Sequence, residues 1–177
     1  EHGQMLAFEA PHFGAHATLG GAVASGLSGP RRISAGSLRD FVLGVTLMDG
    51  QGRVLRFGGQ VMKNVAGSDV SRLLAGSMGT LGIITEVSLI VLPQPEEELT
   101  VTIPMGLDEA RTAMQTWAGK PLPISATLWA AGELRVRLSG ASSAIHSAAQ
   151  SIGGDRLEPT AAETLWRQLR EQELPFF

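Results

Sequence analysis

Apolar and polar positions alternate in two parts of the N-terminal half of the chain. Residues 41–48 and 53–57 are rich in apolar and β-branched side chains, and the Asp-Gly-Gln-Gly stretch between them suits a tight turn. This pattern predicts a β-hairpin. Residues 83–92 alternate as well, which predicts a half-buried strand with Thr85 and Val87 on the same face.

Helix-starting signals flank these strands. Residues 18–26 begin with Thr18, whose hydroxyl can accept a hydrogen bond from a free amide at a helix N-terminus. Ser68 or Asp69 is placed to cap a second helix, in which apolar residues recur at i, i+3 and i+4, and Gly76 stands where a helix ends. Residues 5–8 predict a short strand, and residues 28–38 a loop.

The pattern changes after residue 95, where the density of glycine falls. We therefore predict two domains, residues 1–95 and residues 96–177. The second domain has the element order β-α-β-β-α, which is typical of the start of a split βαβ layer, so the chain as a whole belongs to the α+β class. Its strands are expected at 98–103, 124–130 and 134–138, and its helices at 107–118, 142–152 and 160–172.

Composition excludes several classes of function. A net charge of −3 offers no basic stripe for nucleic acid. The absence of cysteine excludes disulfides, thiolate catalysis and iron–sulfur ligation by this chain, and it fits a reducing compartment. The longest uncharged stretch, residues 10–30, holds five glycines and two prolines, which argues against a transmembrane helix.

Glycine is the most informative residue type. The chain has 22 glycines among 177 residues, about 12% against a usual value of about 7%. Gly76, Gly79 and Gly82 are evenly spaced, but a helix precedes them and a strand follows. A dinucleotide or P-loop site needs the reverse order, so neither reading holds. A ligand-binding loop and a tight turn that admits a buried strand both remain open.

A second glycine motif lies at the start of the first predicted helix. Thr18 is followed by Leu19, Gly20 and Gly21, so free amides and the positive end of the helix dipole would be exposed without Cβ obstruction. Such a surface suits a pyrophosphate or the edge of a flavin. The alternative is a close contact between this helix and a strand.

Other polar residues give weaker signals. His12 and His16 are four residues apart, but Gly14 lies between them and no third ligand is near, so we expect no metal site. Lys63 and Asn64 lie in a glycine-flanked stretch that is either a solvated turn or a contact with a ligand or partner.

Five segments, taken in order, resemble the FAD-binding domain of the vanillyl-alcohol-oxidase type, also called PCMH-type: residues 11–14, 17–21, 36–44, 63–67 and 79–86. Gly29-Pro30-Arg31-Arg32, followed by residues 39–44 and 57–67, is similar to the FAD-binding E subunits of glycolate oxidase (glycolate dehydrogenase). The similarity is strong over residues 5–95 and weak beyond.

This resemblance implies a cofactor and a set of contacts. In such proteins FAD lies extended between two α+β subdomains, and backbone atoms line the flavin, ribose and adenine. Residues 1–95 correspond to the second of these subdomains, and residues 96–177 to part of an antiparallel-sheet cap domain. The implied FAD-binding residues are Thr18, Leu19, Gly20, Gly21, Ala24, Gly26, Gly36, Asp40, Gly82, Ile83 and Ile84.

The resemblance also sets limits on this chain. The subdomain with the pyrophosphate loop would precede Glu1, so we expect a fragment that binds FAD weakly or not at all and is inactive alone. Ser68 stands where the E subunits have an aromatic residue. No catalytic residue can be carried over to the segments present.

The implied function is that of a subunit of a heteromeric flavoprotein oxidoreductase that oxidises a 2-hydroxy acid, glycolate to glyoxylate, and passes electrons onward. The implied partners are a catalytic flavoprotein homologue and an iron–sulfur subunit, in the cytoplasm or held at the inner face of the membrane by those partners. One alternative is a non-catalytic accessory subunit that keeps the flavoprotein fold. Another is the related reductase of cell-wall precursor synthesis, whose nicotinamide site and catalytic Ser and Glu are not located in this sequence.

Overall fold

The computed structural model describes residues 2–59 and 69–177. The chain divides into two compact units, which are described separately below. The first unit comprises Glu1–Pro93 with Arg170–Gln172, and the second comprises Gln94–Leu169 with Glu173–Phe177.

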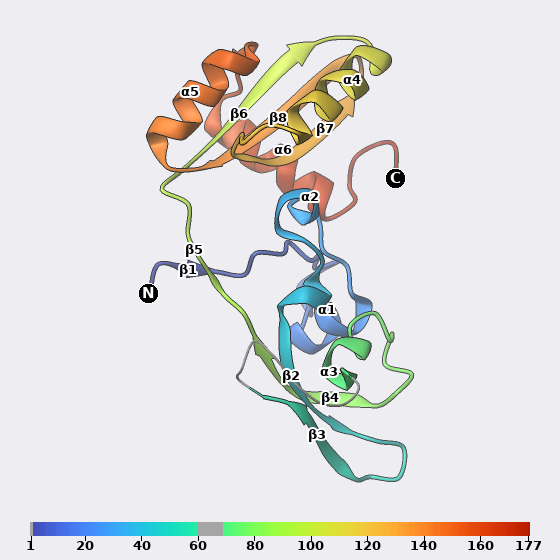
Figure 1. The fold of residues 1–177 in the computed structure, drawn as a ribbon. Coiled ribbons are helices and arrows are strands. Elements are labelled where there is room, and N and C mark those ends of the chain that lie inside the picture. Colours follow the sequence, from blue (N-terminus) through green and yellow to red (C-terminus); the bar gives the residue numbers. More distant parts are fainter. Residues whose placement is uncertain (1, 60–68) are drawn as a thin grey trace. The chain divides into compact units, whose positions relative to one another are not determined.

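A three-stranded antiparallel sheet forms the centre of the first unit (Figure 1). Strand β2 (Val42–Met48) lies between β3 (Val54–Gly58) and β4 (Ile83–Leu89). Asp49 fixes the turn from β2 to β3, because its carboxylate accepts hydrogen bonds from the amides of Gln51 and Arg53 at 2.9 and 3.0 Å. The predicted hairpin is confirmed.

Strand β4 carries a bulge. Glu86 pairs with Thr46 and Ile84 pairs with Leu47, so two residues of β2 face three residues of β4 and Thr85 is the extra one. The bulge places Ile84 with Val87 against the core and leaves Thr85 exposed. The prediction that Thr85 and Val87 share a face is therefore wrong, since strict alternation does not allow for the added residue.

Short elements complete the first unit. Residues 28–38, predicted as a loop, contain one helical turn and the start of a second. Residues 5–8, predicted as a strand, pair only at Met5, while Ala7 and Phe8 are buried side chains of the core. The elements are β1 (Gln4–Met5), α1 (Leu19–Ser25), α2 (Arg32–Ala35), the 3₁₀ helix η1 (Leu38–Phe41), α3 (Val70–Leu73) and β5 (Leu92–Pro93), which pairs with β1.

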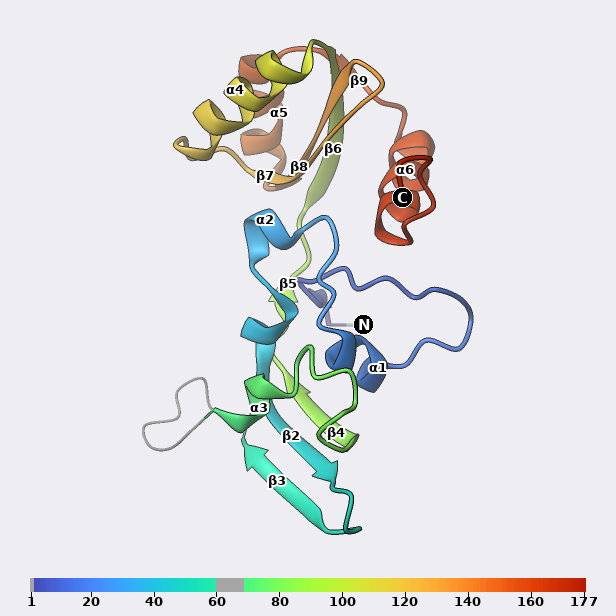
Figure 2. The same ribbon diagram turned by 90° about the vertical axis from the view of Figure 1, so that its right-hand side faces the viewer.

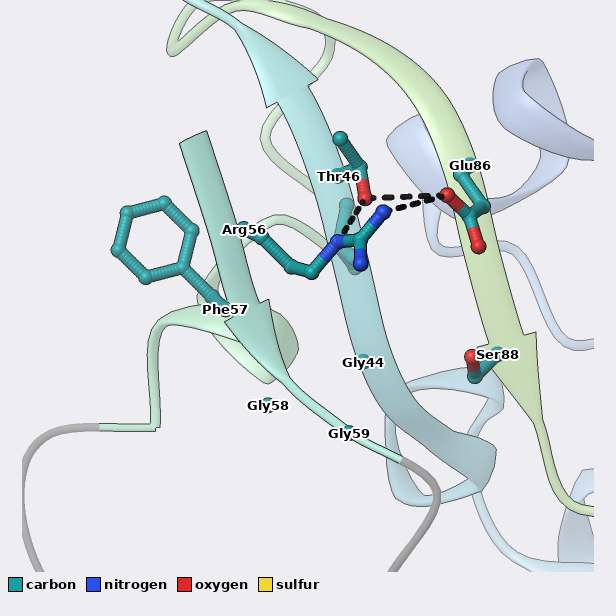
Figure 3. Close-up of a pocket in the computed structure, with 9 residues that line it drawn as sticks. Gly44, Thr46, Arg56, Phe57, Gly58, Gly59, Glu86 and Ser88 are labelled. Atoms are coloured by element: carbon teal, nitrogen blue, oxygen red, sulfur yellow. Dashed lines mark hydrogen bonds and ion pairs between the residues drawn. The ribbon is translucent and has the colours of Figure 1, made fainter. Parts of the chain in front are cut away.

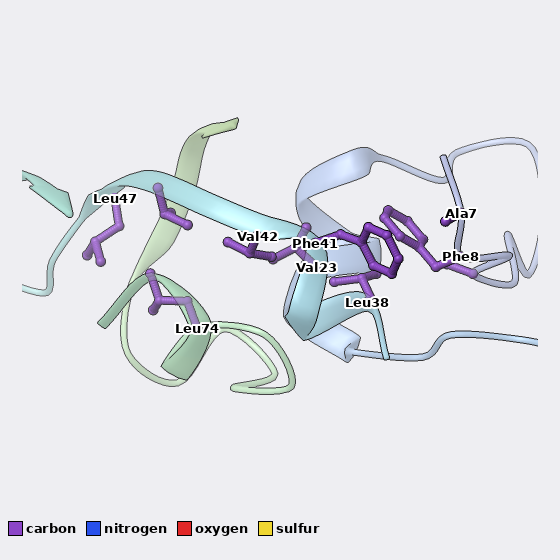
Figure 4. Packing of buried hydrophobic residues seen from close by; sticks show 10 residues of the cluster. Ala7, Phe8, Val23, Leu38, Phe41, Val42, Leu47 and Leu74 are labelled. Carbon is purple, nitrogen blue, oxygen red and sulfur yellow. The ribbon is translucent and has the colours of Figure 1, made fainter. Parts of the chain in front are cut away.

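The core of this unit joins α1, η1 and the sheet (Figure 4). Val23 of α1 and Leu38 of η1 are fully buried, as is Leu74 just after α3. The rings of Phe8 and Phe41 pack with their centroids 6.1 Å apart. Because each element is too short to be stable alone, this shared apolar cluster is what fixes α1 against the sheet.

The second unit is a four-stranded antiparallel sheet with the order β7-β8-β6-β9. The last strand is only a two-residue ladder at the edge. This is the strand order that a split βαβ layer requires, so that prediction is confirmed. The elements are β6 (Glu97–Pro104), α4 (Leu107–Ala118), β7 (Ile124–Ala130), β8 (Glu133–Gly140), α5 (Ser142–Ile152), β9 (Asp155–Arg156) and α6 (Pro159–Arg170).

Helices cover both faces of this second sheet (Figure 2). Helices α4 and α5 pack on one face and α6 on the other. Trp166 anchors α6, because its Nε1 donates to the Thr100 hydroxyl at 2.9 Å and the Arg137 guanidinium lies 4.9 Å from its ring centroid. Across the parts of the chain that the structure describes, no helix is both long enough and apolar enough to cross a membrane.

Candidate functional site

Thr18 caps α1, as the sequence predicted. Its Oγ1 accepts a hydrogen bond from the amide of Gly21 at 3.0 Å, and its carbonyl accepts from Ala22 at 3.0 Å. The helix is seven residues long and has no acidic residue in its first turn. The first turn is exposed at Thr18, Leu19 and Gly21.

The predicted glycine loop is attached to the other end of α1. The amide of Gly76 donates to the carbonyl of Val23 at 3.0 Å, and the amide of Met78 donates to that of Ala24 at 2.8 Å. The bond from Met78 gives the Ala24 carbonyl a partner, and the bond from Gly76 adds to the one that the Val23 carbonyl accepts from the Gly26 amide at 3.2 Å. The two glycine motifs of the sequence are therefore parts of one substructure.

The start of α1 also lies against the start of β4. A Cβ added at Gly20 would come 3.6 Å from the carbonyl oxygen of Ile84, which is ordinary contact. The structure thus brings the predicted residues of α1 next to Gly82, Ile83 and Ile84, although about 60 positions separate them in the sequence.

Large apolar side chains are exposed around this junction. Leu19 is 44% exposed and Ile83 is 62% exposed, and Met78 and Leu81 of the glycine loop are also exposed. Exposed apolar side chains and exposed glycine backbone are features that a flat, largely apolar ring system can contact, although Ile83 and Ile84, as neighbours in a strand, point to opposite faces of the sheet. The start of α1, where Leu19 and Gly21 are exposed, therefore fits one part of a flavin site. Sequence reasoning did not identify Met78 or Leu81.

At two of the predicted glycines, the backbone conformation and close main-chain atoms leave no room for a Cβ. Gly26 has a φ of +68° and a Cβ there would lie 2.9 Å from Gly76 Cα. Gly82 has a φ of +150° and a Cβ would lie 2.7 Å from the carbonyl oxygen of Met48. Backbone packing accounts for both. Gly21 differs, because it is exposed and its nearest neighbour would be the Thr18 hydroxyl at 3.1 Å.

Asp40 has a structural partner that the sequence did not reveal. Its carboxylate accepts hydrogen bonds from the Ser37 hydroxyl at 2.8 Å and from the Ser37 amide at 3.2 Å, which caps η1. The Ser37 hydroxyl is the main reason why the pKa of Asp40 is lowered, and the guanidinium groups of Arg72 and Arg39 act in the same direction. Gly36, with a φ of +93°, lies at this turn.

A pocket of about 110 Å³ lies on the first unit's sheet, lined by residues of β2, β3 and β4 and by Gly59 (Figure 3). Arg56 donates to the Thr46 hydroxyl at 3.3 Å and to the Glu86 carboxylate at 3.4 Å, and Thr46 donates to Glu86 at 3.3 Å. These groups satisfy one another, and the pocket includes none of the FAD-binding residues predicted from the sequence. We therefore do not assign this pocket to FAD.

Some predicted features cannot be placed. Lys63, Asn64 and Ser68 lie outside the described residues. His12 and His16 are exposed, and within residues 2–59 and 69–177 no group of three or more His, Cys, Asp or Glu side chains could hold a metal ion.

A family model described as an FAD binding domain matches residues 1–58. Glycolate oxidase subunit GlcE of Escherichia coli (strain K12) is 49% identical over 175 residues, which cover 99% of this chain and 49% of that protein. Residues 1–58, about a third of the chain, match the FAD binding domain family. The resemblance to the E subunits of glycolate oxidase is thereby confirmed, and the chain spans about half the length of that relative.

Two further relatives share shorter regions. The D-lactate dehydrogenase of Archaeoglobus fulgidus is 34% identical over 117 residues, 65% of this chain and 26% of that protein. Glycolate oxidase subunit GlcD of Bacillus subtilis (strain 168) is 40% identical over 84 residues, 48% of this chain and 18% of that protein.

The fold also has solved counterparts. A structure of alkyldihydroxyacetonephosphate synthase matches with a TM-score of 0.71 at 17% identity, over 96% of this chain and 39% of that one. At this identity the match bears on the fold alone. The α+β, FAD-binding type of fold that the sequence predicted is confirmed.

Proposed function

We propose that this protein is the FAD-binding subunit of a multisubunit flavoprotein oxidoreductase that oxidises a 2-hydroxy acid, with glycolate giving glyoxylate. The identity of 49% to glycolate oxidase subunit GlcE over 99% of the chain carries the proposal. Relatives named as dehydrogenases of D-lactate and D-2-hydroxyglutarate support the wider substrate class, because glycolate, lactate and 2-hydroxyglutarate share a hydroxyl group next to a carboxylate.

The surface at the start of α1 is the part of this chain that we assign to FAD. FAD supplies the redox chemistry, since it accepts the hydride equivalent from the carbon that bears the hydroxyl group. The chain's own contribution is to bind and orient: the exposed backbone at Gly21 allows close approach, and Leu19 and Ile83 offer apolar contact. Ala24, Gly26, Gly36, Asp40, Gly82 and Ile84 belong to the proposed set, with Gly26, Gly82 and Asp40 holding the backbone in shape.

The test is made on the full-length gene product, purified alone and together with its partner subunits. We expect bound FAD in the purified protein, and bleaching of the flavin absorption when glycolate is added without oxygen. D-lactate serves as the comparison substrate. Protein that contains no FAD and takes up none when it is added would contradict the proposed cofactor, and bleaching by D-lactate but not by glycolate would contradict the proposed substrate.

The same experiment separates catalysis from docking. If glycolate reduces the flavin of the lone subunit, the chemistry takes place on this subunit. If reduction needs the flavoprotein homologue, this protein is the accessory subunit, which docks onto that homologue and onto an iron–sulfur subunit. We propose that the assembly works in the cytoplasm or against the inner face of the membrane.

The 177 residues alone should bind FAD weakly. The proposed contacts include open surface of the first unit, where Leu19 is 44% exposed and Ile83 is 62% exposed. Titration of the isolated chain, followed by quenching of FAD fluorescence, should give no saturation at micromolar cofactor. Submicromolar binding would show that these residues form a complete site.

A further inference from the structure

One motif named in the sequence analysis has no part in the proposed site: Gly29-Pro30-Arg31-Arg32. In the structure Arg31 is buried, with 8% of its surface exposed, and it lies against Glu9. The Glu9 carboxylate accepts a hydrogen bond from the Arg31 amide at 2.9 Å and forms an ion pair with Nε of Arg31 at 3.6 Å. Burying a charged pair carries a desolvation penalty, so stability alone is a weak reason for this pair to be there.

The backbone around the pair is joined equally closely. The amide of Glu9 donates to the carbonyl of Ser28 at 2.9 Å. Gly29 has a φ of +69°, and a Cβ there would lie 2.0 Å from the carbonyl oxygen of Glu9, so only glycine fits. We call Glu9 with Ser28, Gly29 and Arg31 the Glu9–Arg31 clasp.

The clasp closes a segment that contains the α1 part of the proposed FAD surface. Between its two sides lie an exposed stretch, residues 12–17, and then α1 with Thr18 at its start. On the C-terminal side the link to α1 is short, because the Ser28 hydroxyl donates to the carbonyl of Gly26 at 3.3 Å and accepts from the amide of Leu38 at 2.9 Å. The clasp therefore sets both the point where the exposed stretch leaves the core and the point where α1 ends.

We propose that Glu9 and Arg31 are positioning residues for FAD: their ion pair fixes the register of the clasp and thereby the place of the α1 start relative to β4. An apolar pair could hold two segments together with similar strength, but apolar contacts do not specify which atoms meet. A carboxylate that accepts from the Arg31 amide and also pairs with the guanidinium of the same residue specifies which atoms meet. The inference rests on the proposed function, since it concerns the binding of the same cofactor.

Two variants of the full-length protein separate positioning from stability. Arg31→Met leaves the Glu9 carboxylate without its guanidinium, so both the Tm and the FAD affinity should fall. Glu9→Leu together with Arg31→Met removes both charges but also the acceptor of the Arg31 amide, so the Tm should recover part of the way toward the wild-type value. FAD affinity should stay about tenfold or more below wild type in both, because neither variant restores the paired contacts that specify the register. Arg56→Met, which breaks the exposed Arg56–Glu86 pair in the same unit, is the control and should change neither quantity.

The outcomes are distinct. If FAD affinity recovers with the Tm in the double variant, or never falls, the clasp only stabilises the fold and the inference is wrong. If the double variant does not recover its Tm, hydrogen exchange decides: faster exchange confined to Leu19–Ser25 supports positioning, and equal acceleration in β2 overturns it. Failure of the unmodified protein to bind FAD would instead refute the proposed function.

Discussion

Gly21→Ala is the substitution that best separates the cofactor from the fold. Gly21 is the third residue of α1, a position where capping-box helices carry residues with a Cβ. Alanine in place of glycine in a helix is worth about 0.5–1 kcal/mol. The added methyl would lie 3.1 Å from the Thr18 hydroxyl, which must shift by a few tenths of an ångström and offsets part of that gain. We therefore expect a change in the free energy of unfolding of no more than about 0.5 kcal/mol.

The effect on FAD should be much larger. If the cofactor packs on the exposed backbone at Gly21, the methyl takes the place of cofactor atoms in van der Waals contact, and binding should weaken by a factor of about ten, or about 1.4 kcal/mol. The assay is FAD titration by fluorescence, together with chemical denaturation, on the full-length protein. Gly50→Ala is the control, because this turn glycine has open space around it and no positive φ. A Gly21→Ala protein that binds FAD within twofold of wild type would refute the placement of the cofactor at α1.

Two further predictions concern the fold around the site. Gly26→Ala should destabilise the protein by about 3 kcal/mol in chemical denaturation, because left-handed alanine costs about 1–2 kcal/mol and the 2.9 Å approach to Gly76 adds overpacking. The added methyl of Gly76→Ala would meet nothing within 4 Å, so this variant should cost only about 1 kcal/mol in the same assay. Equal costs would show that the contact is not tight. Asp40→Ala should cost about 1 kcal/mol near neutral pH by removing the cap with Ser37. Because folding lowers the pKa of Asp40, the stability that its carboxylate contributes is present above the ordinary aspartate pKa of about 3.9 and is lost as the pH falls through the lower pKa of the folded state. In urea denaturation at a series of pH values, the difference in unfolding free energy between wild type and Asp40→Ala should therefore shrink below about pH 4. A difference that does not change with pH would contradict this linkage.

The second unit was the easier part of the fold to predict. Its helices are eleven or twelve residues long and its hairpin turns at Gly132, which has a φ of +80°, so local signals and tertiary packing agree. The first unit has helices of four to seven residues. Elements this short are set by tertiary contacts rather than by propensity, which is why residues 28–38 were predicted as a loop and the bulge at Thr85 was missed.

For the site, the sequence identified the segments but not the reasons for their residues. Thr18 was predicted as a cap because an N-cap hydroxyl has a local signature. Asp40 could be named only through the family resemblance, because its partner Ser37 forms a reciprocal cap on a 3₁₀ turn that carries no apolar period. The exposure of Leu19 and Ile83 could not be read from the sequence at all, because an apolar residue in a strand or helix is expected to face the core.

The glycines of the proposed site differ in the reason for which they are glycine. The sequence left two explanations open for each glycine motif, a ligand or a close backbone contact. Backbone contact accounts for Gly26 and Gly82, where a Cβ would overlap main-chain atoms. It does not account for Gly21, which no main-chain atom crowds. A bound FAD would give Gly21 a reason of its own, so the Gly21→Ala titration tests the assignment at a residue that the packing of the described residues does not require to be glycine.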